Sequence, residues 1–187
     1  MEDLVEVEIQ KLIGPTAHGA AVLLGNEEKS FVVFIGPFEA EAIRRELTGT
    51  RAERPLTHDL VHSILIGFDL EVRRVVITQI VENAFCATLV LDQKVTEQNH
   101  AWVGRRNEVR IDARPSDCLV LALKNRVDIH VTRDVFDQVQ DVSHLEPADL
   151  ILEGSTPSAG ADGIEEVEFL SSWGADPESE GDDDDQV

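Results

Sequence analysis

Hydrophobic and polar residues alternate along several short segments of the chain. In residues 4–13, Val5, Val7 and Ile9 alternate with charged or polar neighbours, which is the period of a strand with one buried face. Similar apolar-rich segments bounded by turn residues predict strands over residues 20–24, 30–35, 70–81, 84–91, 108–112 and 128–131. Turn-forming residues predict a turn at 14–15 and tight hairpins at 26–28 and 82–83.

Other segments carry the signals of helices, over residues 37–47, 59–66, 115–126 and 132–139. Thr57 and Thr132 are expected N-caps. Pro115 suits a first helical turn, where Ser116 and Asp117 offer oxygens to free N–H groups. The following run, 118–123, is apolar on all sides, which indicates a helix buried on most faces.

Runs of hairpins separated by helices favour one α+β domain, with a mixed or antiparallel sheet and helices packed on it. We expect this domain to cover residues 1–145, with residues 92–107 as a longer polar loop that contains Trp102.

Two segments also share one pattern, a strand followed by a proline, an acid and a helix. Aligning Pro37 with Pro115 places Glu39 on Asp117. This match predicts an internal duplication with a period of about 78 residues. The alternative is that the pattern is a common helix start, since an acid there interacts favourably with the helix dipole.

The charge is concentrated at the C-terminal end. Residues 146–187 hold 14 of the 37 acids and no lysine or arginine, and the net charge of the whole chain is −21. A flexible, disordered acidic tail is therefore expected over 146–187. Its apolar residues Ile164, Val167, Leu170 and Trp173 could instead form a short helix on a protein partner. Bulk negative charge opposes broad nucleic-acid binding, but it leaves room for a local arginine patch, since 12 of the 16 basic residues are Arg.

Targeting signals are absent from the given sequence. Cys86 and Cys118 show no pairing pattern and suggest a reducing compartment. The first residues lack the features of a secretory signal, and no apolar run approaches the ~18 residues of a membrane span. A cytoplasmic protein without a membrane partner is expected.

Three segments in order, IGPFEAEAI (35–43), RPLTHDL (54–60) and IDARPSDCLVLAL (111–123), resemble the hallmark segments of the bifunctional nuclease domain family, known as BFN or DUF151. The resemblance covers roughly residues 4–140. It implies an α+β fold, a tendency to form homodimers, and DNase or RNase activity in some members. An exposed strand such as 84–91, which would need cover, also favours a homodimer.

Phosphodiester hydrolysis needs an activated water, charge stabilisation at phosphoryl oxygens and, usually, a hard divalent cation such as Mg²⁺ or Mn²⁺. The three segments supply candidates for these roles. The catalytic candidates are His58, as general base, and Glu39, Asp59, Asp112 and Asp117; the phosphate-binding candidates are Arg54, Arg114 and Ser116; the metal-ligand candidates are Asp59, Asp112 and Asp117. We expect Glu39, His58, Asp59, Asp112, Arg114 and Asp117 to converge on one cleft.

Each candidate also has a structural interpretation. The acids could serve helix N-termini, and Arg54, Asp59, Asp112 and Arg114 could form a salt-bridged staple between the two halves. His58 and His62 have zinc-helix spacing, but a third ligand is missing. Two function classes follow, a metal-assisted nuclease and a non-catalytic dimeric binding or regulatory module with a small-anion site.

Overall fold

A computed structural model of the protein describes residues 3–16, 19–93, 108–145 and 166–168. Its strands form one mixed sheet in the order β3-β2-β1-β7-β4-β5-β6, with β8 paired to β1. The strands are β1 (Leu4–Thr16), β2 (Gly19–Gly25), β3 (Ser30–Ile35), β4 (Leu70–Val81), β5 (Ala84–Gln93), β6 (Glu108–Ala113), β7 (Ile129–Thr132) and β8 (Glu166–Glu168). The helices are α1 (Pro37–Thr48), α2 (Thr57–Gly67), α3 (Pro115–Asn125) and α4 (Arg133–Gln138). The predicted α+β class is confirmed.

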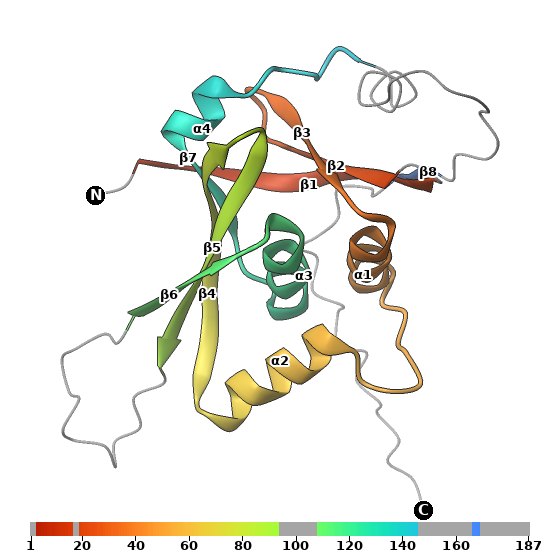
Figure 1. The fold of residues 1–187 in the computed structure, drawn as a ribbon, viewed down its shortest axis with the longest axis vertical. Helices are drawn as coiled ribbons and strands as arrows, with labels where there is room; N and C mark the ends of the chain where they lie inside the picture. The colour runs from red at the N-terminus through yellow and green to blue at the C-terminus, as the bar shows by residue number, and fades with distance from the viewer. Residues whose placement is uncertain (1–2, 17–18, 94–107, 146–165, 169–187) are drawn as a thin grey trace, which may run out of the picture.

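The sheet consists of two similar halves joined by β7. Strands β1-β2-β3 form an antiparallel meander followed by α1, and β4-β5-β6 form another followed by α3. Strand β7 lies between them, antiparallel to β1 and parallel to β4. Figure 1 shows α1 and α3 side by side in the angle between the two meanders. This repeated order of elements is what an internal duplication predicts.

Helix α3 is the central element of the core, as its apolar run predicts. Residues Cys118 to Ala122 are all buried, and Ala40 and Ile43 of α1 are completely buried beside it. Both helices begin with a proline in the first turn and end at a left-handed residue, Gly49 for α1 and Arg126 for α3. The two helices therefore enter the core in the same way, with their N-termini directed to one region of the surface.

Both predicted hairpins are confirmed. Asn26 Oδ1 accepts the backbone N–H of Glu28 at 2.9 Å, which closes the turn between β2 and β3. Glu82 and Asn83 have φ values of 49° and 64°, the consecutive left-handed pair of a tight hairpin turn.

The predicted turn at 14–15 is wrong, because β1 continues to Thr16. Gly14 adopts a φ of 91°, and the β1–β2 pairing is irregular between Ile13 and Thr16. Such a local irregularity is accommodated within a strand as a bulge.

The predicted caps are also wrong, because no side chain at the N-cap position of α2, α3 or α4 makes a cap hydrogen bond. At α2, Asp59 Oδ2 instead accepts the backbone N–H of Leu56 at 2.7 Å. Thr57 lies inside α2, which Leu56 precedes. Thr132 Oγ1 donates to the carbonyl of Thr78 at 3.1 Å instead. The threonine hydroxyl thus joins β7 to β4 rather than capping α4.

Strand β5 is not exposed as an edge, since β4 and β6 flank it. The edge strands along the main sheet order are β3 and β6. The remainder of the predicted loop, 94–107 with Trp102, lies outside the described residues.

In the acidic segment, which was expected to be a disordered tail with a short helix as the alternative, the described residues Glu166–Glu168 form a strand. Ile164, Leu170 and Trp173 lie outside the described residues.

Among the helices that the structure describes, none is long and apolar enough to cross a bilayer.

Candidate functional site

Four side chains from three helix starts meet at one place, which we call the Arg114 cluster: Glu39 of α1, His58 of α2, Arg114 immediately before α3, and Asp117 of α3. Arg114 donates from Nη1 to Glu39 Oε1 at 2.8 Å, from Nε to Asp117 Oδ2 at 2.9 Å and from Nη2 to Asp117 Oδ1 at 3.2 Å. Its guanidinium therefore joins the two acids that the alignment of Pro37 with Pro115 places in equivalent positions.

The corner before each helix fixes this geometry. Arg114 and Gly36 occupy the same extended backbone conformation ahead of a first-turn proline, which suits proline's fixed φ. A Cβ at Gly36 would overlap the Glu39 carboxylate. Glycine at position 36 thus lets Glu39 fold back over the chain toward Arg114. Sequence reasoning missed this role, although the glycine directly precedes Pro37.

His58 is the remaining member of the cluster, and its neutral imidazole has one donor and one acceptor nitrogen. Its Nε2 lies 3.1 Å from Asp117 Oδ1. Since an ionised carboxylate only accepts hydrogen bonds, we assign the proton to Nε2, and Nδ1 then carries the lone pair. The His58 side chain is 21% exposed and that of Asp117 is 31% exposed, so the pair is sheltered but reachable.

The hydrogen bonds between Arg114 and Asp117 keep both side chains ionised. Burial by itself raises the pKa of Asp117, but hydrogen bonds from Arg114 and His58 outweigh it and hold that pKa below its usual range. The pKa of Arg114 is raised, chiefly by its hydrogen bond to Asp117. Burial raises the pKa of the neighbouring Cys118 thiol to about 12, with further contributions from Asp117 and Asp112. That thiol is therefore not a nucleophile at neutral pH.

Asp59 follows His58 in the sequence but belongs to a different group, which we call the Lys124 cluster: Glu46, Asp59 and Lys124. Lys124 Nζ lies 2.7 Å from Asp59 Oδ1 and 2.8 Å from Glu46 Oε1. The pKa of Asp59 is lowered by the hydrogen bonds from Lys124 and from the backbone N–H of Leu56. Asp59 is thus engaged in holding α1, α2 and α3 together.

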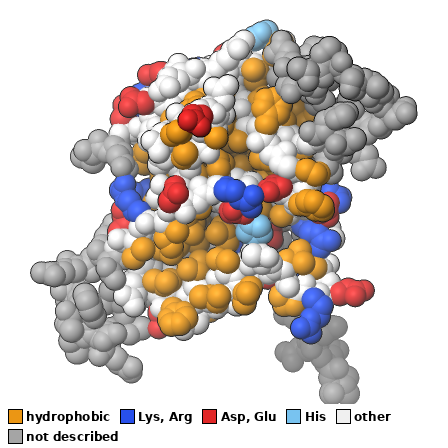
Figure 2. Space-filling view, in the orientation of Figure 1, with side chains coloured by type: hydrophobic (Ala, Val, Ile, Leu, Met, Phe, Trp, Pro, Cys, Tyr) orange, Lys and Arg blue, Asp and Glu red, His pale blue; other side chains and the backbone are white. Residues whose placement is uncertain are grey.

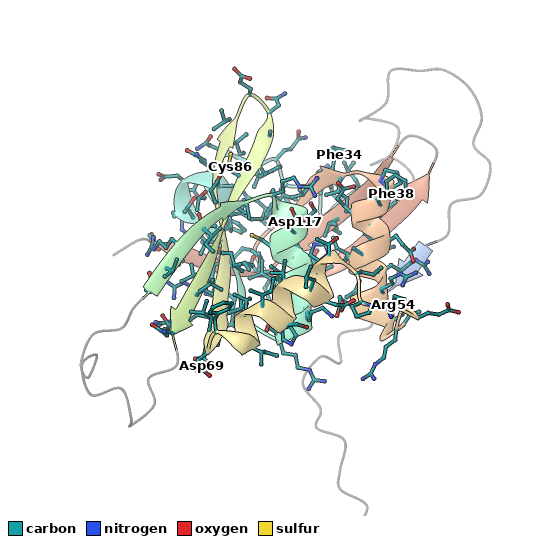
Figure 3. All side chains as sticks on the ribbon, turned by 60° about the horizontal axis from the view of Figure 1, so that its bottom comes forward. Phe34, Phe38, Arg54, Asp69, Cys86 and Asp117 are labelled. Carbon is teal, nitrogen blue, oxygen red and sulfur yellow. The ribbon has the colours of Figure 1, made fainter. Side chains whose placement is uncertain are left out.

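The remaining candidates, Asp112, Arg54 and Ser116, belong to neither cluster. Asp112 is exposed on β6, paired with Thr88 of β5. Arg54 is exposed before α2, and Figure 3 shows it away from Asp117. Ser116 is buried. The structure brings together Glu39, His58, Arg114 and Asp117, as predicted, whereas the Asp59 carboxylate pairs with Lys124 instead. Asp112 lies near enough to Cys118 to contribute to the raised pKa of that thiol.

The alternative interpretation, a staple of Arg54, Asp59, Asp112 and Arg114, is not found among the described ion pairs, in which Arg114 pairs with Glu39 and Asp117 and Asp59 pairs with Lys124. In the described parts of the chain, no group of three His, Cys, Asp or Glu side chains could hold a metal ion. Asp59, Asp112 and Asp117 therefore do not form a ligand set.

Large apolar side chains are exposed on the elements around the Arg114 cluster, a feature that the sequence analysis did not identify. They are Phe34 and Phe38 at the β3–α1 corner, Leu60 and Ile64 on α2, and Val109 and Ile111 on β6, each between 39% and 87% exposed. We call these six residues the apolar rim. Figure 2 shows charged and histidine side chains gathered over the helix starts, with hydrophobic side chains over α2 and β6 below them. Exposed apolar side chains that gather on one face of a protein are typical of an interaction site.

Comparison with known proteins agrees with this geometry. Residues 22–143 match the bifunctional nuclease domain. The chain belongs to the bifunctional nuclease domain family. That match includes all members of the Arg114 cluster, the Lys124 cluster and the apolar rim.

Two similar relatives are proteins of Mycobacterium tuberculosis, "Uncharacterized protein MT1877" of strain CDC 1551 / Oshkosh and "Uncharacterized protein Rv1829" of strain H37Rv. Each is 31% identical over 113 residues, which cover 60% of this chain and 60% of the relative. Their names describe no activity, so the chemistry of this family member has to be inferred from its own residues.

Proposed function

We propose that this bifunctional nuclease domain protein hydrolyses phosphodiester bonds of DNA or RNA at the Arg114 cluster. The observation that carries the proposal is the His58–Asp117 hydrogen bond of 3.1 Å beside a 65% exposed arginine. An oriented imidazole and a guanidinium are the groups that water activation and phosphate recognition require. The family description supports the same chemistry.

In this mechanism, Asp117 accepts a hydrogen bond from the Nε2–H of His58, so that Nδ1 acts as the base. Nδ1 takes a proton from a water as the water oxygen attacks phosphorus. The P–O bond to the leaving nucleotide oxygen breaks, and the imidazolium returns the proton to that oxygen. Arg114 has five N–H donors, of which three bind Glu39 and Asp117. The remaining two can donate to the phosphoryl oxygens. Glu39 acts as a positioning residue that fixes the guanidinium.

A metal held by the protein does not fit these residues well. The carboxylates of Glu39 and Asp117 are already joined by the Arg114 guanidinium, which provides positive charge at that place. A divalent cation such as Mg²⁺ or Mn²⁺, which retains several waters and binds with substrate phosphates, would need ligands from the substrate. The mechanism therefore assigns no step to a protein-held metal.

The test is a nuclease assay of wild type beside His58→Ala and Asp117→Asn, all purified identically to homogeneity. We expect each variant to lose about a hundredfold or more in rate, as loss of a general base does. His144→Ala and Asp134→Asn are matched controls, because both residues are exposed and lie outside the cluster. Equal activity in all five proteins would identify a contaminating nuclease and overturn the proposal.

A second candidate function rests on the apolar rim. The same cluster could serve as a structural link beneath a surface that binds another copy of the chain, giving a dimeric binding or regulatory module. We propose a homodimer through this surface for either function, and light scattering should give a dimer mass at micromolar concentration. Leu60→Asp should yield a monomer, whereas Val81→Asp, a 48% exposed residue at the β4–β5 hairpin, should not. A monomer mass for wild type would contradict the homodimer.

A further inference from the structure

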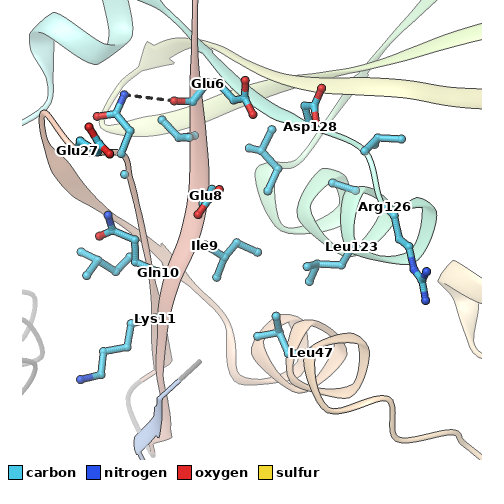
Figure 4. A pocket seen from close by; sticks show the side chains of 17 residues that line it. Glu6, Glu8, Ile9, Gln10, Lys11, Glu27, Leu47, Leu123, Arg126 and Asp128 are labelled. Carbon is cyan, nitrogen blue, oxygen red and sulfur yellow. Dashed lines mark hydrogen bonds between the residues drawn. The ribbon is translucent and has the colours of Figure 1, made fainter. Parts of the chain in front are cut away.

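A large groove lies beside β1, at the ends of α1 and α3 opposite to the Arg114 cluster. It has a volume of about 1320 Å³. Figure 4 shows Ile9 of β1, Leu47 of α1 and Leu123 of α3 around one shared space. Small-molecule pockets measure roughly 300–1,000 Å³, so this groove has the dimensions for a segment of polypeptide.

The backbone beside the groove is an interrupted strand edge. On the side of β1 away from β2, β7 pairs with Leu4–Val7 and β8 pairs with Lys11–Ile13. Residues 8–10 lie between these two partners, and no described strand pairs with them on that side. Unpaired strand edges favour the addition of another strand.

The register of β8 directs the chain into this gap. Strand β8 is antiparallel to β1, with Glu166 opposite Ile13 and Glu168 opposite Lys11. The next three residues, 169–171, would therefore come opposite residues 10, 9 and 8. Among the described strands, β8 is the one whose continuation in the sequence leads directly into this gap.

The sequence after β8 is suited to the groove. Phe169, Leu170 and Trp173 are apolar, and residues 169–174 carry no charge although acids lie on both sides of them. The groove wall includes four acids, Glu6, Glu8, Glu27 and Asp128, which outnumber its two bases, Lys11 and Arg126. These acids would repel an anionic ligand, whereas an uncharged apolar segment meets no such penalty.

We propose that this groove binds the chain's own segment 169–173, of which residues 169–171 extend β8 along the free edge of β1. The segment covers Ile9, Leu47 and Leu123 and completes the strand pairing of β1 between β8 and β7. The C-terminal part of the chain is thereby attached to the folded domain at the end far from the candidate active site.

Amide hydrogen exchange of residues 8–10 in the full-length chain tests this proposal. Leu170→Asp introduces a charge that the acidic groove disfavours, and exchange at these residues should become about tenfold faster or more, since local opening sets the rate. Ser158→Asp adds the same charge outside the segment and should leave the rate as in wild type. Equal rates in wild type and Leu170→Asp would overturn the proposal.

A second measurement uses tryptophan fluorescence. The chain has two tryptophans, so Trp102→Phe leaves Trp173 as the single reporter. Its emission should move to longer wavelength when Leu170→Asp is added. Protection of residues 8–10 that increases with protein concentration would assign the segment to a second copy of the chain and would also overturn the proposal.

Discussion

The Arg114 cluster and the Lys124 cluster join the same three helices, but they differ in how far their charges are open to solvent. The Arg114 side chain is 65% exposed, whereas that of Lys124 is 16% exposed and pairs with acids from α1 and α2. His58 and Asp59 are sequence neighbours, yet they belong to different clusters. A charged group on a helix start is therefore available for chemistry only where its geometry leaves donors or lone pairs unused.

This difference predicts opposite roles. An exposed ion pair contributes about 0–1 kcal/mol to stability because water screens it. A sheltered charge whose partners are removed leaves uncompensated groups and costs more. We therefore expect the Arg114 cluster to matter chiefly for activity and the Lys124 cluster chiefly for stability.

Among the variants that test this comparison, the largest effect is expected for Arg114→Lys. Lysine keeps the charge but cannot reproduce the fork that binds Glu39 and Asp117, so nuclease activity should fall about tenfold to a hundredfold. The free energy of unfolding should change by less than about 1 kcal/mol. Arg133→Lys is the control, because Arg133 is exposed and its ion pairs measure 3.9–4.0 Å. A large loss of stability with unchanged activity would reverse the assignment of roles.

Lys124→Met should show the opposite behaviour. Methionine retains much of the length of the side chain but leaves Asp59 and Glu46 without their shared partner. We expect the free energy of unfolding in urea to fall by about 2 kcal/mol. Arg51→Met is the control, because Arg51 is exposed. Lys29 is unsuitable, because its side chain donates to two backbone carbonyls. Unchanged stability would show that the Lys124 cluster is not a structural link.

The sequence predicted most of the fold because the elements are locally encoded. Alternation along 4–13 and the apolar run at 118–123 identify a half-buried strand and a buried helix without further information. Helix starts were less well predicted, since Thr57 and Thr132 have the chemistry of N-caps but tertiary contacts determine where their hydroxyls bind. The bulge at Gly14 resembles a turn in sequence because both use the same residue types.

The site was predicted in part for a related reason. Pro37 and Pro115 locate the helix starts, and the acid two residues later gives Glu39 and Asp117. Which acid faces which base depends on the angle between helices, and this separates Asp59 from His58. The apolar rim was missed because its phenylalanine, leucine, isoleucine and valine side chains would equally suit a buried face. Only the tertiary packing shows that they are exposed.

Acid sensitivity should reveal both clusters. The pKa values of Asp117 and Asp59 lie below their usual range, so each ionised carboxylate stabilises the folded state above the unfolded pKa of about 4. This stabilisation is lost as the pH falls below that value through the folded pKa values. Unfolding in urea between about pH 5 and pH 3 should show a weaker pH dependence for Asp117→Asn and for Asp59→Asn than for wild type. Identical slopes in all three proteins would remove the electrostatic account of both clusters.

The smallest effect is expected from the acidic C-terminal segment, which carries 14 acids and no lysine or arginine in residues 146–187. As a tethered polyanion it has an effective concentration near arginine side chains that should reach roughly the millimolar range. With segment 169–173 held in the groove, the 9 residues from Trp173 to Asp182 can extend about 30 Å, which is more than the length of α1 at about 18 Å. The Asp182 to Asp185 run could therefore reach the two unused N–H donors of Arg114.

Deletion of residues 151–187 should accordingly tighten DNA or RNA binding by a few-fold at low salt. The gain should fade as ionic strength rises, because the competition is electrostatic. Replacing Asp182 to Asp185 by asparagine keeps the length of the segment and should reproduce part of the gain. Binding curves at two salt concentrations measure both effects. If the full-length and shortened proteins give superimposable curves at low salt, the segment acts only as a solubilising extension. The acidic run then does not compete with nucleic acid for the unused N–H donors of Arg114.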